Sequence, residues 1–186
     1  MQIGRTLYAP DRKTWREWLR KNYKTEKEIW LIYYRKEAGR PRIAYNDAVE
    51  EALCFGWIDS TVKKLANDRV AQRFSPRNPN SEYSQANQER LRRLIAKGRV
   101  RKDVLAGLAE IAPEKYVFPA DIMKALRANQ RAYDHFSEFS APYRRIRIAY
   151  IDSARRRPAE FKKRLDHFLK LTEQGRQFGF GIESFF

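Results

Sequence analysis

Residues 52–61 read ALCFGWIDST, and within these ten residues the sequence changes from a helical pattern to a strand pattern. Val49 and Leu53 lie four residues apart, as residues on one face of a helix do. Gly56 predicts the end of this helix, because glycine readily adopts the left-handed conformation that commonly follows a helix C-terminus. From Trp57 onward polar and apolar residues alternate loosely with a period of two. The stretch therefore predicts a helix that leads directly into a strand.

A small antiparallel sheet is predicted around this point. The segments WIDSTVKKL (57–65) and RVAQRFSPR (69–77) are separated by Ala66 to Arg69, ANDR, which is typical of a turn. The segment IWLIYY, which starts at Ile29, is apolar on both faces and indicates a central strand covered on both sides. We expect the hairpin to pair with this strand.

Helices are expected to flank the sheet. Asp11 can cap a first helix, and the residues after it at helical spacing are Trp15, Trp18, Leu19 and Tyr23. Asp47 followed by Glu50 fits a capping box, which predicts that the next helix begins at Asp47. The segment SPRNPNSEYS (75–84) contains two prolines and predicts an irregular loop.

The remainder of the chain is predicted to be helical. Ser84 can cap one helix that Gly98 ends, and a second is expected to run through Leu105 and Leu108 to Pro113. Three further helices are marked by Ile122, Leu126 and Tyr133, by Ser140, Ile146 and Tyr150, and by Phe161, Leu165, Phe168 and a final Gly175. We therefore predict an α+β protein with a small antiparallel sheet and flanking helices in the N-terminal half, and an all-helical C-terminal half. The predicted domains are residues 1–112 and 113–186.

The net charge of +16 is distributed along the whole chain. The excess is +5 in residues 1–66, +5 in residues 67–112 and +6 in residues 113–186. Such a distribution attracts polyanions without selecting one of them. The densest cluster, RRRPAEFKKR, is either a phosphate-binding face or the solvated side of a helix that begins at Pro158. Its cationic residues are Arg155, Arg156, Arg157, Lys162, Lys163 and Arg164.

Four blocks carry a resemblance to a known family: AVEEALCFGWIDS (48–60), RFSPRNPNSEYSQAN (73–87), PADIMKAL (119–126) and YRRIRIAYIDSA (143–154). With these blocks the chain resembles the YdeI/OmpD-associated family, also called bacteriocin-protection proteins, over nearly its whole length. ALCFGWIDS and FSPR are the most specific. The resemblance implies a role in resistance to antimicrobial peptides or bacteriocins and an association with an outer-membrane porin, but no established reaction. Tyr83 departs from the family pattern, which usually has a tryptophan before the loop serine.

A candidate binding pocket is predicted where the hairpin meets the proline-containing loop. Trp57 and Asp59 are two residues apart in a strand, so their side chains share one face. Aromatic walls and donors for an anionic group are expected from Trp57, Asp59, Arg73, Arg77, Ser81, Tyr83, Ser84 and Asn87. The alternative is that Asp59 pairs with one of the two arginines to fix the loop to the sheet, and that Trp57 belongs to the core.

The other reactive residues form no complete catalytic or metal-binding motif. Cys54 lies in an apolar segment between Leu53 and Phe55, which predicts a buried, unreactive thiol. His135 and His167 fall on separate predicted helices, and no motif supplies the further ligands that zinc or iron needs. We therefore expect no metal and no cofactor, and an enzyme is the least favoured class.

Two functions of different classes fit these patterns. The favoured one is a stress-resistance binding protein that recognises an anionic or peptide partner through Trp57, Asp59, Arg77 and Tyr83. The alternative is a nucleic-acid or polyanion binder that uses the distributed charge. The apolar runs are shorter than a membrane span of roughly 20 residues, so we expect no membrane insertion. The N-terminus lacks the apolar core of a secretory signal, and one cysteine fits a reducing compartment, so we expect a cytoplasmic protein. The partner and the oligomeric state are left open.

Overall fold

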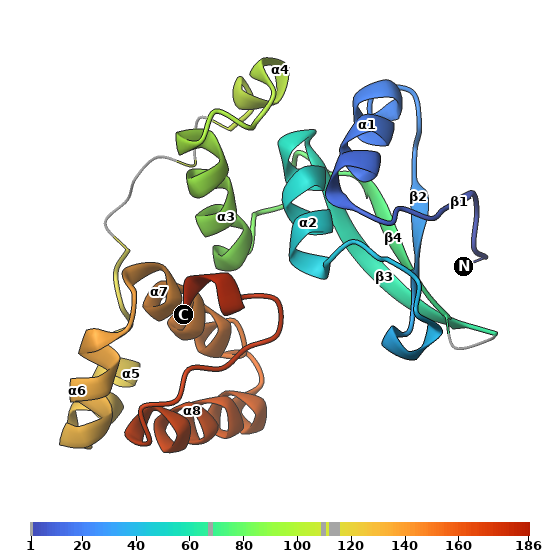
Figure 1. Cartoon of the computed structure of the whole chain (residues 1–186). Coiled ribbons are helices and arrows are strands. Elements are labelled where there is room, and N and C mark those ends of the chain that lie inside the picture. Colours follow the sequence, from blue (N-terminus) through green and yellow to red (C-terminus); the bar gives the residue numbers. More distant parts are fainter. Residues whose placement is uncertain (1, 67–68, 109–110, 112–115) are drawn as a thin grey trace. The chain divides into compact units, whose positions relative to one another are not determined.

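The computed structural model describes residues 2–66, 69–108, 111 and 116–186 (Figure 1). The chain divides into two compact units. The sheet unit comprises Met1–Glu82 and Arg90–Ala112, and the helical unit comprises Tyr83–Glu89 and Pro113–Phe186. The described residues form a four-stranded sheet in the N-terminal half, and the C-terminal half is helical. The predicted α+β class is therefore confirmed.

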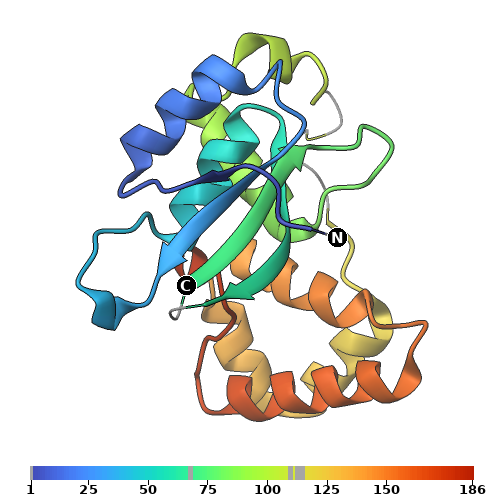
Figure 2. The same ribbon diagram turned by 90° about the vertical axis from the view of Figure 1, so that its right-hand side faces the viewer.

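The strands of the sheet unit are β1 (Thr6–Leu7), β2 (Ile29–Tyr34), β3 (Trp57–Leu65) and β4 (Arg69–Pro76). Their order is β1, β2, β4, β3, and Figure 2 shows β4 between β2 and β3. The predicted hairpin of β3 and β4 is confirmed, and β4 pairs antiparallel with β2 as expected. β1 pairs parallel with β2, and its two residues are too few to carry a periodic signal. The predicted turn includes residues 67–68, which lie outside the described part of the chain.

Along the sequence, α1 (Arg12–Asn22) precedes β2 and α2 (Tyr45–Cys54) follows it. A short 3-10 turn, η1 (Lys36–Ala38), lies between β2 and α2. The predicted cap of α1 is confirmed, because the Asp11 carboxylate accepts the backbone N–H of Thr14 at 2.7 Å. The capping box at the start of α2 is wrong: the N-cap is Ala44, and both Asp47 and Glu50 bind Arg12 instead. Gly56 follows the helix end with a φ of +71°, as predicted.

The two faces of the sheet carry different layers. On one face Trp15 of α1 packs against Phe74 of β4, with ring centroids 5.3 Å apart. The opposite face carries a smaller buried cluster, made of Trp30, Ile32 and Ala71. Five of the six residues of β2 are buried, which confirms the prediction of a central strand covered on both sides.

The loop after β4 leads into α3 (Gln85–Ala96), and α4 (Lys102–Leu105) follows. The Ser84 hydroxyl accepts the backbone N–H of Asn87 at 3.4 Å, so the predicted cap of α3 is confirmed. The division between the units falls inside α3, after Glu89. The helix expected through Leu105 and Leu108 is shorter than predicted, because α4 ends at Leu105. The last part of that prediction, residues 109–110 and 112–113, lies outside the described residues.

The helical unit contains α5 (Ala120–Arg127), α6 (Gln130–Glu138), α7 (Ala141–Asp152), α8 (Pro158–Glu173) and a 3-10 turn, η2 (Glu183–Phe185). The single helix predicted through Ile122 and Tyr133 is wrong, because Asn129 ends α5 and caps α6 by accepting the N–H of Ala132 at 3.0 Å. The predicted starts of α7 and α8 are confirmed. The helices bury a shared core, whose residues include Ile122, Leu126, Phe136, Ile148, Ile151 and Phe168.

Candidate functional site

Trp57 is a core residue of the sheet unit. It is 1% exposed, and its indole N–H donates to the backbone carbonyl of Tyr23 at 3.0 Å. Its ring packs edge-on against Trp18, with centroids 5.7 Å apart. An indole with its donor satisfied and almost no exposed surface has little to offer a ligand. The structure therefore favours the alternative interpretation of Trp57, as a packing residue.

Asp59 lies on the same face as Trp57 and accepts hydrogen bonds from neutral groups, while the charge of Arg90 also acts on it. Its Oδ2 accepts hydrogen bonds from the amide of Gln72 at 2.8 Å and from the hydroxyl of Tyr45 at 3.2 Å. Burial raises the pKa of Asp59 above its ordinary range. The sheet unit thus contains a partly buried carboxyl group whose ionised form is made less favourable by burial.

Arg73 does not pair with Asp59. Its Nε donates to Glu28 at 2.6 Å, and its Nη1 reaches the hydroxyl of Ser60 at 3.3 Å. Asp59 is opposite Phe74 in the ladder, one position along from Arg73, and successive residues of a strand point to opposite faces. Of the two arginines that the alternative interpretation offered to Asp59, Arg73 is therefore excluded, and a pair with Arg77 stays a prediction.

The other residues of the predicted pocket are divided between the units. In the sheet unit the backbone N–H of Arg77 donates to the carbonyl of Gly56 at 3.0 Å, and the Ser81 hydroxyl donates to the carbonyl of Asn78 at 2.8 Å. Tyr83, Ser84 and Asn87 belong to the helical unit. A loop pocket that joins the two sets stays a prediction.

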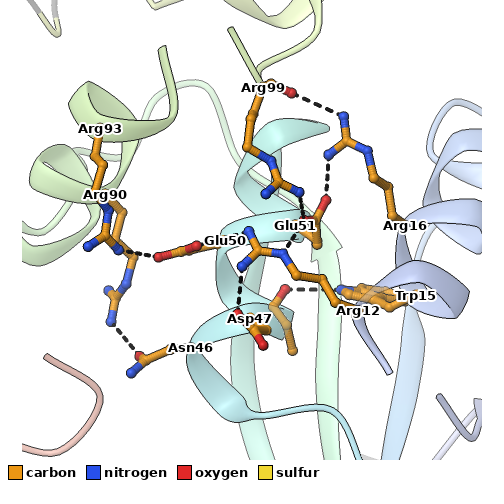
Figure 3. Close-up of polar contacts among 11 residues, drawn as sticks. Arg12, Trp15, Arg16, Asn46, Asp47, Glu50, Glu51, Arg90, Arg93 and Arg99 are labelled. Atoms are coloured by element: carbon orange, nitrogen blue, oxygen red, sulfur yellow. Dashed lines mark hydrogen bonds and ion pairs between the residues drawn. The ribbon is translucent and has the colours of Figure 1, made fainter. Parts of the chain in front are cut away.

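A buried ion network joins the helices of the sheet unit (Figure 3). Glu51 of α2 is 0% exposed, and its carboxylate binds three guanidinium groups. Nε of Arg12, Nη1 of Arg16 and Nη2 of Arg99 each lie 2.5 Å from a carboxylate oxygen of Glu51. The charge of Glu51 is therefore fully compensated by cations from α1 and from the segment after α3.

Glu50 and Asp47 extend this network along α2. Arg12 also binds Asp47 at 2.6 Å and Glu50 at 2.9 Å, while Arg93 of α3 binds the other oxygen of Glu50. Figure 3 shows Arg12 between the three carboxylates. The network is structural, because arginines of α1 and α3 bind its carboxylates and connect these two helices to α2. The sequence signal for it was two adjacent acids in an otherwise apolar helix.

The helical unit contains a cavity of about 730 Å³ beside α7 and α8. This volume lies within the range of small-molecule sites in proteins. Its polar lining comprises Ser84, Gln85, Arg147, Ser153, Glu160, Lys163, Arg164 and His167. Its apolar lining comprises Ala86, Ile146, Ala149, Tyr150, Phe178, Gly179, Phe180 and Ile182. Cationic side chains outnumber carboxylates on these walls.

Arg147 is the unusual member of this lining. It is 6% exposed, and among the described residues its buried Nε has no hydrogen-bond partner and no carboxylate pairs with it. Two aromatic rings lie close to it: the Phe178 centroid lies 3.9 Å from its Cζ, and the Tyr150 centroid lies 5.0 Å away. Burial lowers the pKa of Arg147 below the ordinary value of an arginine, yet arginine remains protonated near neutral pH. A buried, uncompensated cation beside a cavity is suited to bind an anion.

α7 and α8 place these side chains by helical spacing. Arg147 and Tyr150 are three residues apart on α7, and Glu160, Arg164 and His167 repeat at steps of four and three on α8. The charge of Arg164 is compensated by Glu160, whose carboxylate its Nε binds at 2.7 Å. Sequence reasoning missed Arg147, because YRRIRIAYID contains three arginines and nothing in its pattern shows which one is buried.

The predicted basic cluster is partly compensated. Arg155 binds Asp121 at 2.9 Å and Asp152 at 2.6 Å, and Lys162 binds Asp166 at 2.7 Å. Arg156 and Arg157 are exposed, while Lys163 and Arg164 line the cavity. The cluster is therefore split between surface ion pairs and the wall of the cavity.

Cys54 is buried as predicted, and burial raises its pKa to about 11. His135 contacts the carbonyl of Thr172 at 3.0 Å, and His167 packs against the ring of Phe178. Among the described residues no group of three or more His, Cys, Asp or Glu side chains could hold a metal ion. No helix in the described part of the chain is long and apolar enough to cross a membrane.

Comparison with known families divides the chain at almost the same place as the fold. Residues 115–175 match the family described as Bacteriocin-protection, YdeI or OmpD-Associated, which confirms the resemblance over α5–α8. Residues 7–107, more than half of the chain, match a domain of unknown function (DUF8412). ALCFGWIDS and FSPR, the blocks taken as most specific, lie in this second match. No curated protein and no solved structure matches the chain.

The cavity-lining residues of α7 and α8 lie in the bacteriocin-protection match, whereas the buried ion network lies in the other match. The chain belongs to the family described as a domain of unknown function (DUF8412), and its residues 115–175 match the YdeI/OmpD-associated, bacteriocin-protection family.

Proposed function

We propose that this protein is a binding protein that takes an anionic group of its partner into the cavity of the helical unit. The single observation that supports this is Arg147, a guanidinium group that is buried beside the cavity without a carboxylate. Burying a charge costs several kcal/mol unless something compensates it. A bound anion is the natural compensation.

The biological role that we propose is protection against antimicrobial peptides or bacteriocins. Its support is the description of the family that matches residues 115–175, the stretch that contains Arg147. In this proposal the protein acts by holding its partner, and the binding site is the cavity of the helical unit instead of the pocket predicted where the hairpin meets the proline-containing loop. A strain that carries Arg147→Met should lose the protection that a wild-type copy gives.

The direct test is thermal unfolding of the full chain with acetate, benzoate and inorganic phosphate. At least one of these anions should raise the unfolding temperature of the wild type and leave that of Arg147→Met unchanged. Lys162→Met is the matched control, because it removes one positive charge from a side chain that is 77% exposed and lies outside the cavity lining. Equal shifts in all three proteins would show that the anions act non-specifically and would contradict the proposal.

The second candidate is a polyanion binder, favoured by the net charge of +16. Salt dependence separates the two functions. A polyanion binder loses affinity linearly in log salt, with a slope of about −0.9 for each phosphate contact, whereas a cavity with one buried cation loses little. A steep slope for a short DNA duplex, unchanged in Arg147→Met, would favour the second candidate.

A further inference from the structure

The chemistry of the cavity walls also restricts the kind of anion that fits. The observations that matter are the orientation of Arg147, the charges near it and the apolar surface around it. All of them belong to the helical unit.

Two aromatic rings lie close to the Arg147 guanidinium group at the cavity. The Phe178 ring lies 3.9 Å from its Cζ, within the distance of a cation–π contact, and the Tyr150 ring lies 5.0 Å away. A ring in such a contact leaves the N–H groups at the rim of a guanidinium group available for hydrogen bonds, and the buried Nε of Arg147 has no hydrogen-bond partner among the described residues. The rim is a fork of parallel donors, and it matches the two oxygens of a carboxylate.

The charge near Arg147 suits one negative charge better than two. Arg164 is the neighbouring cation, but its Nε binds Glu160 at 2.7 Å and its Nη1 binds the carbonyl of Tyr150 at 2.8 Å. Glu160 lines the cavity as the partner of Arg164, so this pair supplies no net positive charge for a second negative charge on a ligand. Lys163 also lines the cavity but is exposed to solvent, so Arg147 is the buried cation of this lining, and a ligand with one negative charge balances it.

The C-terminal segment holds the remaining wall in place. The hydroxyl of Tyr143 accepts the N–H of Phe178 at 3.0 Å, which anchors this segment to α7. Gly179 has a φ of +137°, and a Cβ there would lie 2.6 Å from Ile182 and 3.2 Å from Nη1 of Arg147. The backbone therefore passes directly against Arg147. Phe178, Phe180 and Ile182 of this segment give the cavity an apolar wall.

We infer that the cavity binds an apolar monocarboxylate, with the carboxylate on the edge of Arg147 and the apolar body against Ile146, Phe178 and Ile182. The carboxylate belongs either to a free acid or to the C-terminal residue of a peptide, since both present the same group. This inference rests on the proposed function, because it names the anion that the same cavity takes.

The test is calorimetric titration of the full chain with hydrocinnamate, its neutral amide hydrocinnamide, and phenyl phosphate. Hydrocinnamate should bind, and the amide should bind at least tenfold more weakly. Phenyl phosphate should bind no more tightly than hydrocinnamate, and Glu160→Gln should improve phenyl phosphate binding. Arg147→Met should weaken hydrocinnamate binding at least tenfold, while Lys162→Met should leave it unchanged.

The outcomes separate this inference from the proposed function. If phenyl phosphate binds more tightly than hydrocinnamate and this binding depends on Arg147, the inference of a carboxylate ligand is wrong, but the proposed anion site stands. Equal affinity for hydrocinnamate and its amide would also contradict the inference that the cavity recognises a carboxylate. Failure of every anion to bind through Arg147 would overturn both. A titration with N-acetylphenylalanine distinguishes the two sources, because it should bind more tightly than hydrocinnamate if the carboxylate belongs to a peptide.

Discussion

Glu51 of the sheet unit and Arg147 of the helical unit are both buried charges, but their surroundings are opposite. Glu51 is bound by Arg12, Arg16 and Arg99 at 2.5 Å each. Arg147 faces the rings of Phe178 and Tyr150, and no carboxylate binds it among the described residues. A buried charge whose partners are all inside the fold serves the fold. A buried charge without a partner lowers stability, and its position beside a cavity points to a ligand.

The largest expected effect on stability comes from removing the charge of Glu51. Glu51→Gln should lower the free energy of unfolding by about 3–5 kcal/mol, because it leaves three buried or half-buried guanidinium groups around a neutral amide. Urea unfolding of the full chain measures this. Glu26→Gln is the control, since among the described residues Glu26 pairs with the exposed Arg5 alone and its loss should cost less than about 1 kcal/mol. If the two variants lost similar stability, the network would not be the structural tie described above.

A smaller effect is expected at Asp59, whose pKa burial raises. A carboxyl group with a raised folded pKa is stabilising in its protonated form, so its contribution falls as pH rises from the unfolded pKa through the folded one. Asp59→Asn removes the cost of ionisation and should therefore be more stable than the wild type at neutral pH. The difference should disappear in acid, below the ordinary pKa range of Asp. Thermal unfolding across this pH range checks it, and a neutral-pH loss of stability would mean that Gln72 and Tyr45 need the charge.

The smallest effect concerns Cys54, which should be chemically silent in the folded protein. It is 0% exposed, and its pKa of about 11 leaves little thiolate near neutral pH. Ellman's reagent should react with it only as fast as the chain unfolds, and at once in denaturing urea. Rapid reaction under native conditions would instead show that this part of the sheet unit opens easily.

The fold was predictable where local chemistry decides it. Asp11 and Ser84 cap helices as expected, and the period of two placed β3 and β4 correctly. The failures have physical causes. Asp47 and Glu50 looked like a capping box, but long-range arginines bind them, and Asn129 divides a helix whose apolar spacing is nearly continuous.

The candidate site was less predictable, because it depends on which charges are compensated. The composition of the Asp59 region indicated an ion pair, yet strand alternation places Arg73 on the other face. Arg147 is one of three arginines in YRRIR, and it differs from Arg144 and Arg145 in being buried, with Phe178 and Tyr150 packed against it. Arg145, for example, binds Glu89 at 2.6 Å. Sequence spacing does not encode such differences.

Arg147 binds a ligand in this account and does not stabilise the folded protein. The most direct measurement is the unfolding free energy of Arg147→Met and of the wild type, each with and without hydrocinnamate. Without ligand, Arg147→Met should be at least as stable as the wild type, because methionine fills the space without burying a charge. With ligand, only the wild type should gain stability. A loss of more than about 2 kcal/mol in ligand-free Arg147→Met, with no hydrocinnamate effect in either protein, would contradict the claim and assign Arg147 to the core.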